Sequence, residues 1–258
     1  MRKTFARELG AAFAHEDVVR NYRHRPPYPR EIFQVLEPLL VAPRVVLDAG
    51  CGTGALTRGL AAFAKRVDAL DPSEAKIAEA RALPGGDDPA IRWIVGRAED
   101  APLRPPYGLI TTGASIHWMD PSMVMPRFRD ALATDAFLAI AELEWVLPEE
   151  EWRTAIVSLI QRYSPIKHHE DFDGRLRSLE EGGHFEKVGK HCAAPVAYEP
   201  SVDEYLAMLA STSSLSRATL KDTRDRFEAD ARTLFEQHGI GRIRLDVVGV
   251  VVWGKPLG

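Results

Sequence analysis

The chain has 258 residues, of which 45% are hydrophobic and 27% are charged, and its formal net charge at pH 7 is -4. This length and composition favour one globular domain with a sizeable core. The small negative charge excludes broad electrostatic attraction to DNA or RNA, and no apolar run approaches the length of a membrane-spanning helix. We therefore expect neither a nucleic-acid partner nor a membrane partner.

Cysteine usage and the first residues favour a reduced setting. Cys51 and Cys192 are the two cysteines of the chain, and they form neither a disulfide framework nor a metal-ligand spacing. The N-terminal stretch is charged at both ends of a short apolar run and lacks the core of a signal peptide. We expect a cytoplasmic protein without a metal site, and the oligomeric state stays open.

The first half of the chain predicts a parallel sheet. Residues 44–145 alternate short apolar runs with helical patterns, which is typical of parallel strands joined by crossover helices. The predicted strands are Val45 to Ala49, Val67 to Leu70, Ile91 to Val95, Tyr107 to Thr112 and Ala136 to Ala141. One predicted helix carries Leu56, Leu60 and Phe63 on one face. Two more predicted helices cover Ser73 to Ala82 and Met123 to Leu132.

The second half predicts helices and a closing strand. Proline and acids suit the first turn of a helix, a Ser/Glu capping box marks a helix start, and glycine marks a helix end. We therefore predict a helix that begins at Pro148 and a polar, irregular stretch over 163–184. A second helix is capped by Ser201 and Glu204, and a third carries Leu220 and Phe227 and stops at Gly239. The last predicted element is an apolar strand from Ile243 to Trp253.

Three glycines follow the first predicted strand at alternate positions, in Asp48-Ala-Gly-Cys-Gly-Thr-Gly54. Glycine costs stability inside regular structure, and a tight turn alone needs only one. The turn lies at the carboxyl end of a parallel strand, where ligands bind in open α/β sheets. Absent side chains let a ligand approach the backbone beside the N–H donors of the next helix. The loop is therefore predicted to bind a ligand.

The loop alone leaves two ligands open. Gly50, Gly52 and Ala55 satisfy the looser dinucleotide pattern G-x-G-x-x-A, and Asp71 lies at a suitable distance to bind a ribose. An NAD-dependent oxidoreductase is thus one interpretation. The motifs that surround the loop favour a different ligand.

Further motifs follow the remaining predicted strands. An acid ends the second strand, at Asp71 before Pro72, and GRAED at 96–100 follows the third. With the acid and G-x-G-x-G of the glycine loop, this set resembles the class I S-adenosylmethionine-dependent methyltransferases. The segment YGLITTGASIHWMD and the lead-in NYRHRPPYP, residues 21–29, resemble the small-molecule, trans-aconitate-methyltransferase-like (type 11) branch. The resemblance covers most of residues 21–145.

The resemblance implies an α/β fold, a doubly wound Rossmann-like sheet of about seven strands with the last strand antiparallel, a helical N-terminal lid and inserted helices. We expect one methyltransferase domain over 1–258. Its parts are the lid at 1–40, the cofactor-binding core at 41–145, substrate-side helices and loop at 146–240, and the terminal strand at 241–258.

The resemblance also implies cofactor contacts. Asp71 would accept hydrogen bonds from both ribose hydroxyls. Glu99 would accept from the adenine amino group while the Ala98 backbone donates to the ring, and Asp100 is an alternative to Glu99. Asp48 would orient the loop and, through water, the amino end of the cofactor. The full expected set is Tyr22, Arg25, Asp48, Gly50, Cys51, Gly52, Gly54, Asp71, Pro72, Ala98, Glu99, Thr112, Gly113 and His117.

Three residues have competing interpretations. His117 follows the fourth strand and would be a general base for an amine or phenol acceptor, or a histidine that only holds its loop. Tyr22 would cap the methionine portion of the cofactor and Arg25 would pair with its carboxylate, or both belong to a solvated basic helix end.

The implied activity is methyl transfer from S-adenosyl-L-methionine, with S-adenosyl-L-homocysteine as product, to a small-molecule carboxylate, hydroxyl or amine. In-line transfer from a sulfonium requires mainly that the protein align the acceptor and exclude water. A non-catalytic S-adenosylmethionine-binding protein and the NAD-dependent oxidoreductase are the alternatives.

Overall fold

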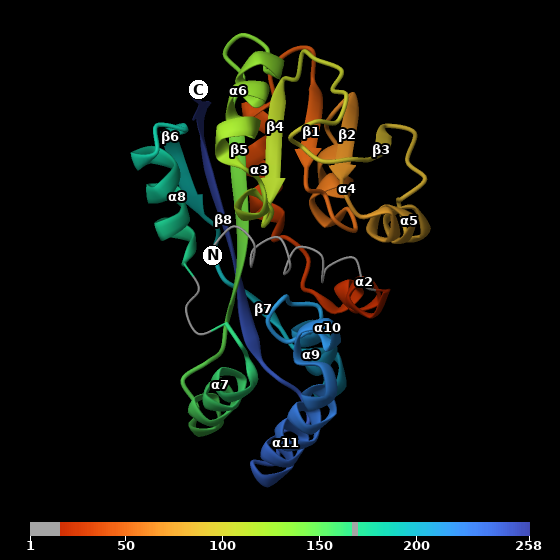
Figure 1. Ribbon diagram of the computed structural model, residues 1–258, viewed down its shortest axis with the longest axis vertical. Coiled ribbons are helices and arrows are strands. Elements are labelled where there is room, and N and C mark those ends of the chain that lie inside the picture. Colours follow the sequence, from red (N-terminus) through yellow and green to blue (C-terminus); the bar gives the residue numbers. More distant parts are fainter. Residues whose placement is uncertain (1–15, 167–169) are drawn as a thin grey trace. The chain divides into compact units, whose positions relative to one another are not determined.

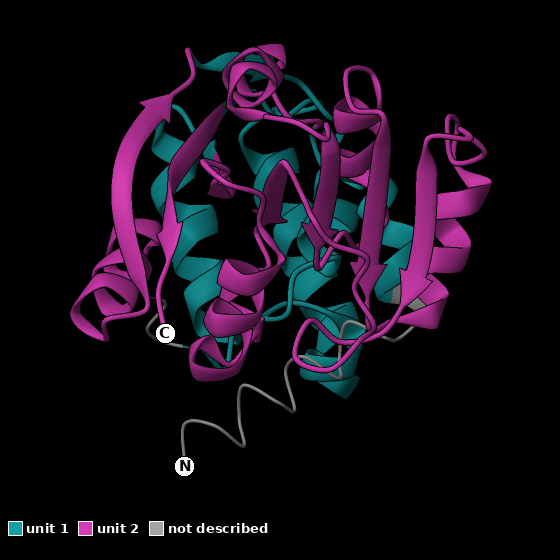
Figure 2. Cartoon of the chain, turned by 90° about the horizontal axis from the view of Figure 1, so that it is seen from above, with its two compact units in different colours: residues 1–26, 145–169, 195–247 teal, residues 27–144, 170–194, 248–258 magenta. Residues whose placement is uncertain are grey.

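The computed structural model describes residues 16–166 and 170–258 (Figure 1). The chain divides into two compact units (Figure 2). Unit 1 comprises residues 1–26, 145–169 and 195–247, and unit 2 comprises residues 27–144, 170–194 and 248–258. Two of the boundaries between the units, after residues 144 and 247, fall inside strands, β5 and β8, which are defined below.

The strands form one eight-stranded sheet with the order β3-β2-β1-β4-β5-β8-β6, and β7 pairs with β8. Strands β1 to β5 pair in parallel, while β8 runs antiparallel to β6 and β7. The predicted doubly wound sheet with an antiparallel last strand is therefore confirmed. The strands are β1 (Val45–Ala49), β2 (Arg66–Asp71), β3 (Ile91–Val95), β4 (Leu109–Gly113), β5 (Leu138–Val146), β6 (Phe185–Cys192), β7 (Val196–Tyr198) and β8 (Leu245–Pro256).

Helices cover both faces of the sheet in unit 2. Successive residues of a strand point to opposite faces, so fully buried strands such as β1 supply two cores. Leu47 packs with Phe128 of α6 in one core, and Val46 packs with Leu36 of α3 and Leu60 of α4 in the other. The helices of this unit are α3 (Arg30–Leu39), α4 (Ala55–Ala61), α5 (Glu74–Ala82), η2 (Ile116–Trp118), α6 (Pro121–Ala131) and α8 (Phe172–Glu181).

Residues 163–184 are not irregular as the sequence suggested, because they contain α8. The Asp171 carboxylate caps this helix by accepting from the Gly174 N–H at 2.6 Å. Its buried residues include Phe172, Leu176 and Leu179, whose spacing is that of one helical face. The polar residues between them hid this pattern. Strand β6 was also missed, because most of its residues are exposed and no apolar run marks it.

Unit 1 holds the remaining helices. The Ser201–Glu204 capping box is present at the start of α9. The helix expected from Pro148 begins at Glu151 instead, and Leu220 belongs to a separate short helix. The elements are α2 (Glu16–Asn21), η1 (Tyr22–His24), α7 (Glu151–Tyr163), α9 (Val202–Ala210), α10 (Arg217–Leu220), η3 (Lys221–Thr223) and α11 (Arg224–Gln237).

Aromatic rings and one buried arginine hold unit 1 together. Trp152 of α7 and Tyr205 of α9 each meet Phe235 of α11 edge to face. Arg224 is 1% exposed, and its guanidinium donates to the carbonyls of Leu215 and Leu206, so α11 is tied to α9. Every helix within 16–166 and 170–258 is too short or too polar to span a bilayer.

Candidate functional site at the carboxyl ends of the strands

The strand order reverses between β1 and β4 in unit 2. Chain connections run from β1 to β2 and β3 on one side, and β4 and β5 follow on the other (Figure 1). Such a reversal is where open α/β sheets bind ligands, beyond the carboxyl ends of the strands. The carboxyl ends of β1, β2 and β4 and the loops after β1, β2, β3 and β4 contain twelve of the residues predicted from the sequence, from Asp48 to His117.

The three loop glycines have left-handed backbones, with φ of 73° at Gly50, 58° at Gly52 and 80° at Gly54. A side chain is strained in that region. Two of the glycines also make room for the protein itself. A Cβ at Gly50 would lie 2.5 Å from Ser115 Cβ, and one at Gly54 would lie 2.4 Å from the Trp93 ring. Internal packing therefore explains part of what the sequence argument assigned to the approach of a ligand.

Asp48 is fully buried at the base of the loop. Its carboxylate accepts from the Thr57 hydroxyl at 2.6 Å and from the Thr111 hydroxyl at 3.0 Å. Burial raises the pKa of Asp48 to about 6, against the lowering effect of those two hydrogen bonds. The side chain thus connects β1 with α4 and β4. Beside it, burial raises the pKa of the Cys51 thiol well above its usual value, so the thiol is unreactive filler in the loop.

Asp71 ends β2 and is 4% exposed. One carboxylate oxygen accepts from the Gly52 N–H and the other from the Ser73 N–H, both at 2.9 Å. A carboxylate oxygen accepts up to two hydrogen bonds, so each oxygen keeps one acceptor position. Pro72 is exposed between these contacts, and Ser73 caps α5.

The two acids in the loop after β3, Glu99 and Asp100, differ in burial. Glu99 is 8% exposed and accepts from the Asp120 N–H at 3.2 Å and from Arg97 at 3.4 Å. Asp100 is exposed. The Ala98 carbonyl accepts from Arg127 at 3.1 Å, which fixes the backbone beside Glu99. Glu99 is therefore the acid that the loop encloses.

The end of β4 carries an unsatisfied hydroxyl and a strained residue. Among the described residues, the fully buried Thr112 hydroxyl has no hydrogen-bond partner. Ala114 has a φ of 49°, which is costly for a residue with a side chain. The Ser115 hydroxyl donates to the Ala49 carbonyl at 2.7 Å. His117 is exposed, and its ring lies 4.6 Å from the Trp118 ring.

Two residues near Gly113 and Gly50 were missed by the sequence reasoning. The Tyr28 hydroxyl lies 2.7 Å from where a Gly113 Cβ would stand, and Ser115 packs against Gly50. Tyr28 stands inside the lead-in motif, so the motif carried a signal for it. Ser115 stands inside the fourth motif, residues 107–120, but its contact with Gly50 joins segments far apart in the sequence.

Tyr22 and Arg25 belong to unit 1. Arg25 is half-buried and stacks 4.0 Å over the Tyr22 ring. Its Nε donates to the Ser211 hydroxyl at 2.8 Å and its Nη2 to the Ser211 carbonyl at 2.7 Å. Arg25 is thus hydrogen-bonded within its unit rather than fully solvated. Residues 1–15 of the expected lid lie outside the described residues.

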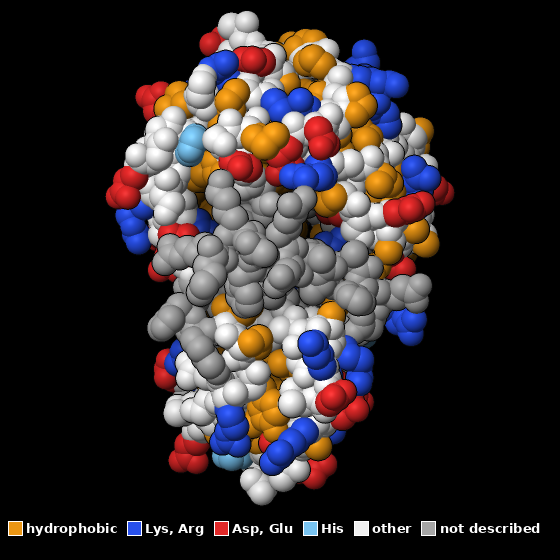
Figure 3. Space-filling model, in the orientation of Figure 1, with side chains coloured by type: hydrophobic (Ala, Val, Ile, Leu, Met, Phe, Trp, Pro, Cys, Tyr) orange, Lys and Arg blue, Asp and Glu red, His pale blue; other side chains and the backbone are white. Residues whose placement is uncertain are grey.

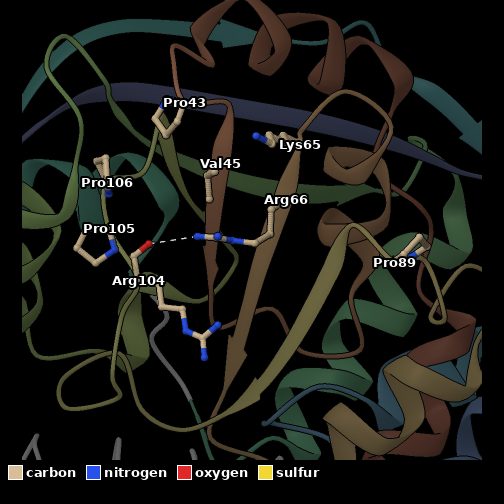
Figure 4. A pocket seen from close by; sticks show the side chains of 8 residues that line it. All are labelled: Pro43, Val45, Lys65, Arg66, Pro89, Arg104, Pro105 and Pro106. Carbon is tan, nitrogen blue, oxygen red and sulfur yellow. Dashed lines mark hydrogen bonds between the residues drawn. The ribbon is translucent and has the colours of Figure 1, made fainter.

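A surface cavity of about 440 Å³ lies elsewhere in unit 2 (Figure 4). It is at the opposite end of the sheet, because Val45 and Arg66 begin β1 and β2. Its lining residues are Pro43, Val45, Lys65, Arg66, Pro89, Arg104, Pro105 and Pro106. In the part of the chain that the structure describes, no three His, Cys, Asp or Glu side chains are placed to hold a metal ion.

Comparison with known proteins matches residues 46–135 to a family described as a methyltransferase domain. Relatives in Mycobacterium bovis and Mycobacterium tuberculosis, each named an uncharacterized methyltransferase, are 35% identical over 105 residues, which is 40% of this chain and 41% of theirs. The chain thus matches about two fifths of the length of these curated relatives.

Two solved structures resemble almost the whole chain. A "putative type II methyltransferase" from Anaeromyxobacter dehalogenans is 26% identical, with a TM-score of 0.67 over 90% of this chain and 97% of that one. A "putative methyltransferase" from Bacillus halodurans is 18% identical, with a TM-score of 0.54 over 88% of this chain and 98% of that one. The second likeness shows the fold alone.

Proposed function

We propose that this chain, whose residues 46–135 match a family described as a methyltransferase domain, is a class I S-adenosylmethionine-dependent methyltransferase that transfers a methyl group from S-adenosyl-L-methionine to a small-molecule acceptor. One observation carries the proposal: Asp71, at the end of β2, holds the backbone of the glycine loop after β1 and keeps acceptor positions on both oxygens. The cofactor supplies a methyl group activated by a positively charged sulfur.

The residues of unit 2 fit this cofactor. The free acceptor positions of Asp71 suit two ribose hydroxyls, and the enclosed Glu99 suits a donor such as the adenine amino group. The buried Thr112 hydroxyl has no partner among the described residues, and a bound ligand would satisfy it. The proposed cofactor set is Asp48, Gly50, Cys51, Gly52, Gly54, Asp71, Pro72, Ala98, Glu99, Thr112, Gly113 and His117, with Tyr22 and Arg25 from unit 1.

The small size of the acceptor is part of the proposal. It is supported by the resemblance of the lead-in and the fourth motif to the trans-aconitate-methyltransferase-like branch. On the face drawn in Figure 3, basic and acidic side chains of the described residues are interspersed, whereas a nucleic-acid site gathers basic ones. His117 is exposed at the end of β4, where it would take a proton from an amine or phenol acceptor. We also propose that the protein is cytoplasmic.

The oxidoreductase alternative has one feature in its favour. Tyr163 and Lys167 have the four-residue spacing of the short-chain reductase pair. However, the Tyr163 hydroxyl donates to Asp230 at 2.7 Å, so it is engaged inside unit 1, and Lys167 lies outside the described residues. A non-catalytic S-adenosylmethionine-binding protein would keep the cofactor loops but lack turnover.

Thermal denaturation with added ligands separates these functions. A ligand that binds only the folded state raises the melting temperature by mass action. S-adenosylhomocysteine is expected to raise it and NAD or NADP is not; the reverse result would refute the methyltransferase proposal. Release of S-adenosylhomocysteine during incubation with a panel of small carboxylates, phenols and amines then tests catalysis. Tight cofactor binding without release for any acceptor class supports the non-catalytic alternative.

A further inference from the structure

The Tyr28 hydroxyl is fitted against the carboxyl end of β4. A Cβ at Gly113 would stand 2.7 Å from this hydroxyl and 3.2 Å from Leu56 Cδ2. Gly113 is the last residue of β4, and Leu56 lies in the first turn of α4, directly after the glycine loop. The hydroxyl therefore lies where the connections of β1 and β4 diverge, at the reversal of strand order.

A second glycine fixes the ring that carries this hydroxyl. Phe33 of α3 meets the Tyr28 ring edge to face, with 6.4 Å between ring centroids. A Cβ at Gly59 of α4 would lie 2.1 Å from a Phe33 ring carbon. Gly59 thus makes room for Phe33, and Phe33 packs on the Tyr28 ring. The Tyr28 hydroxyl in turn occupies space that a side chain at position 113 would fill. The contact of Phe33 with Gly59 and the contact of Tyr28 with Gly113 together restrict where the hydroxyl can lie.

The positions of the acids at the strand ends indicate how the proposed cofactor would be oriented. Asp71 ends β2 and Glu99 lies in the loop after β3, on one side of β1, and both are acids suited to the ribose and adenine of the proposed cofactor. With its ribose and adenine on those acids, the cofactor would extend its remaining end toward β4, on the other side of β1. That end carries the positively charged sulfur, and Tyr28 is the polar group that the row of glycines holds there.

We propose that the Tyr28 hydroxyl oxygen contacts the sulfonium end of the cofactor and makes the site prefer charged S-adenosylmethionine over uncharged S-adenosylhomocysteine. This inference rests on the proposed function. A phenol oxygen still presents a lone pair after its proton is donated to another group, and that lone pair attracts a nearby cation. After transfer the sulfur is neutral, so the attraction ends and product release is favoured.

Tyr28→Phe tests the proposal, because it removes the hydroxyl and keeps the ring that packs on Phe33. Affinities are measured by calorimetry for S-adenosylmethionine, for an analogue with a protonated amine in place of the sulfonium, and for S-adenosylhomocysteine. We expect about 10-fold weaker binding of the two cations, the size of one contact to a charged group, and unchanged binding of S-adenosylhomocysteine.

Gly113→Ala provides a second route, since its Cβ displaces the hydroxyl while the phenol stays intact. It should reduce the same preference for the cations. Tyr163→Phe is the matched control: it removes a hydroxyl that donates to Asp230 at 2.7 Å in unit 1, and it should leave all three affinities unchanged. Melting temperatures of the variants verify that each is folded.

Equal losses for charged and uncharged ligands in Tyr28→Phe would mean that the residue only packs, and the inference would be overturned. Unchanged affinity for all three ligands would overturn it as well. Both results leave the proposed function standing, because the parent chain still binds the cofactor. A parent chain that binds neither S-adenosylmethionine nor S-adenosylhomocysteine would instead refute the proposed function itself.

Discussion

The backbone N–H of Gly52 donates to the Asp71 carboxylate at 2.9 Å. The same carboxylate accepts from the Ser73 N–H with its other oxygen. Two loops from neighbouring strands are therefore held by one buried acid, which also keeps acceptor positions for a ligand. A substitution of Asp71 consequently changes the shape of the glycine loop and the contacts to the cofactor together.

Asp71→Ala should weaken S-adenosylhomocysteine binding by at least about 1.5–3 kcal/mol, the usual contribution of hydrogen bonds to a charged group. Asp71→Asn should lose less, because the amide oxygen still accepts one backbone N–H. It cannot restore the full affinity, since the amide nitrogen faces the second N–H donor. Calorimetry on both variants checks this order, with Asp100→Ala as control because Asp100 is exposed. Unchanged affinity in Asp71→Ala would remove Asp71 from the cofactor site.

Asp48 should make stability fall as pH rises from about 4 to 6. Burial raises its pKa in the folded protein to about 6, while in the unfolded chain the pKa stays near 4. Between these values the unfolded state has released the proton and the folded state still binds it, so rising pH favours unfolding. The effect is on the order of 2–3 kcal/mol and is complete above the folded pKa.

Urea denaturation of the parent chain and of Asp48→Asn across this pH range isolates the contribution. The parent should lose stability relative to Asp48→Asn between pH 4 and 6, and the difference should then level off. A difference that does not change with pH would show that Asp48 titrates normally despite its burial.

Ala114→Gly should stabilise the fold. The left-handed backbone at Ala114, with a φ of 49°, costs about 1–2 kcal/mol for a residue with a Cβ. Glycine removes that cost, while the freer unfolded chain gives back about 0.4–1 kcal/mol. A net gain of up to about 1.6 kcal/mol is expected from these two contributions, measured as an increase in the urea midpoint. If the strain helps to shape the loop before His117, turnover will fall in the same variant.

Ala62→Gly is the matched control for this substitution. Ala62 is exposed and has an ordinary helical φ of -62°. Glycine there should reduce stability by about 0.4–1 kcal/mol, because it makes the unfolded chain freer. Opposite signs at the two positions would establish that backbone strain, and not loss of a methyl group, decides the result at Ala114.

Tyr22 and Arg25 should gain protection from hydrogen exchange when S-adenosylhomocysteine is added. The lead-in motif predicts a lid, and a lid opens locally at low free energy until a ligand holds it closed. Amides of Val45 to Ala49 should be protected with or without ligand, because they lie in a fully buried strand. If amides around Tyr22 exchange at the same rate with and without ligand, the segment is not a lid. Arg25 then only forms its hydrogen bonds to Ser211 and does not bind the cofactor.

Local patterns were enough for the elements that a few neighbouring residues define. The apolar runs predicted β1, β2 and β3 because those strands are short, consecutive and bounded by turn residues. The Ser201–Glu204 capping box was readable because both partners lie within one helical turn. The glycine loop and Asp71 were identified as a site for a similar reason: each lies at the end of its own strand, and parallel strands end at one edge of the sheet.

Other features depended on residues far apart in the sequence, and only the folded chain decided them. Strand β6 forms by pairing along β8, so its exposed residues carry no apolar signal of their own. Glu99 and Asp100 are adjacent acids, and the packing around their loop buries one and exposes the other. Arg25 finds its partner at Ser211, and the Tyr28 hydroxyl fits against Gly113. No local pattern encodes such contacts, because they arise when distant segments pack together.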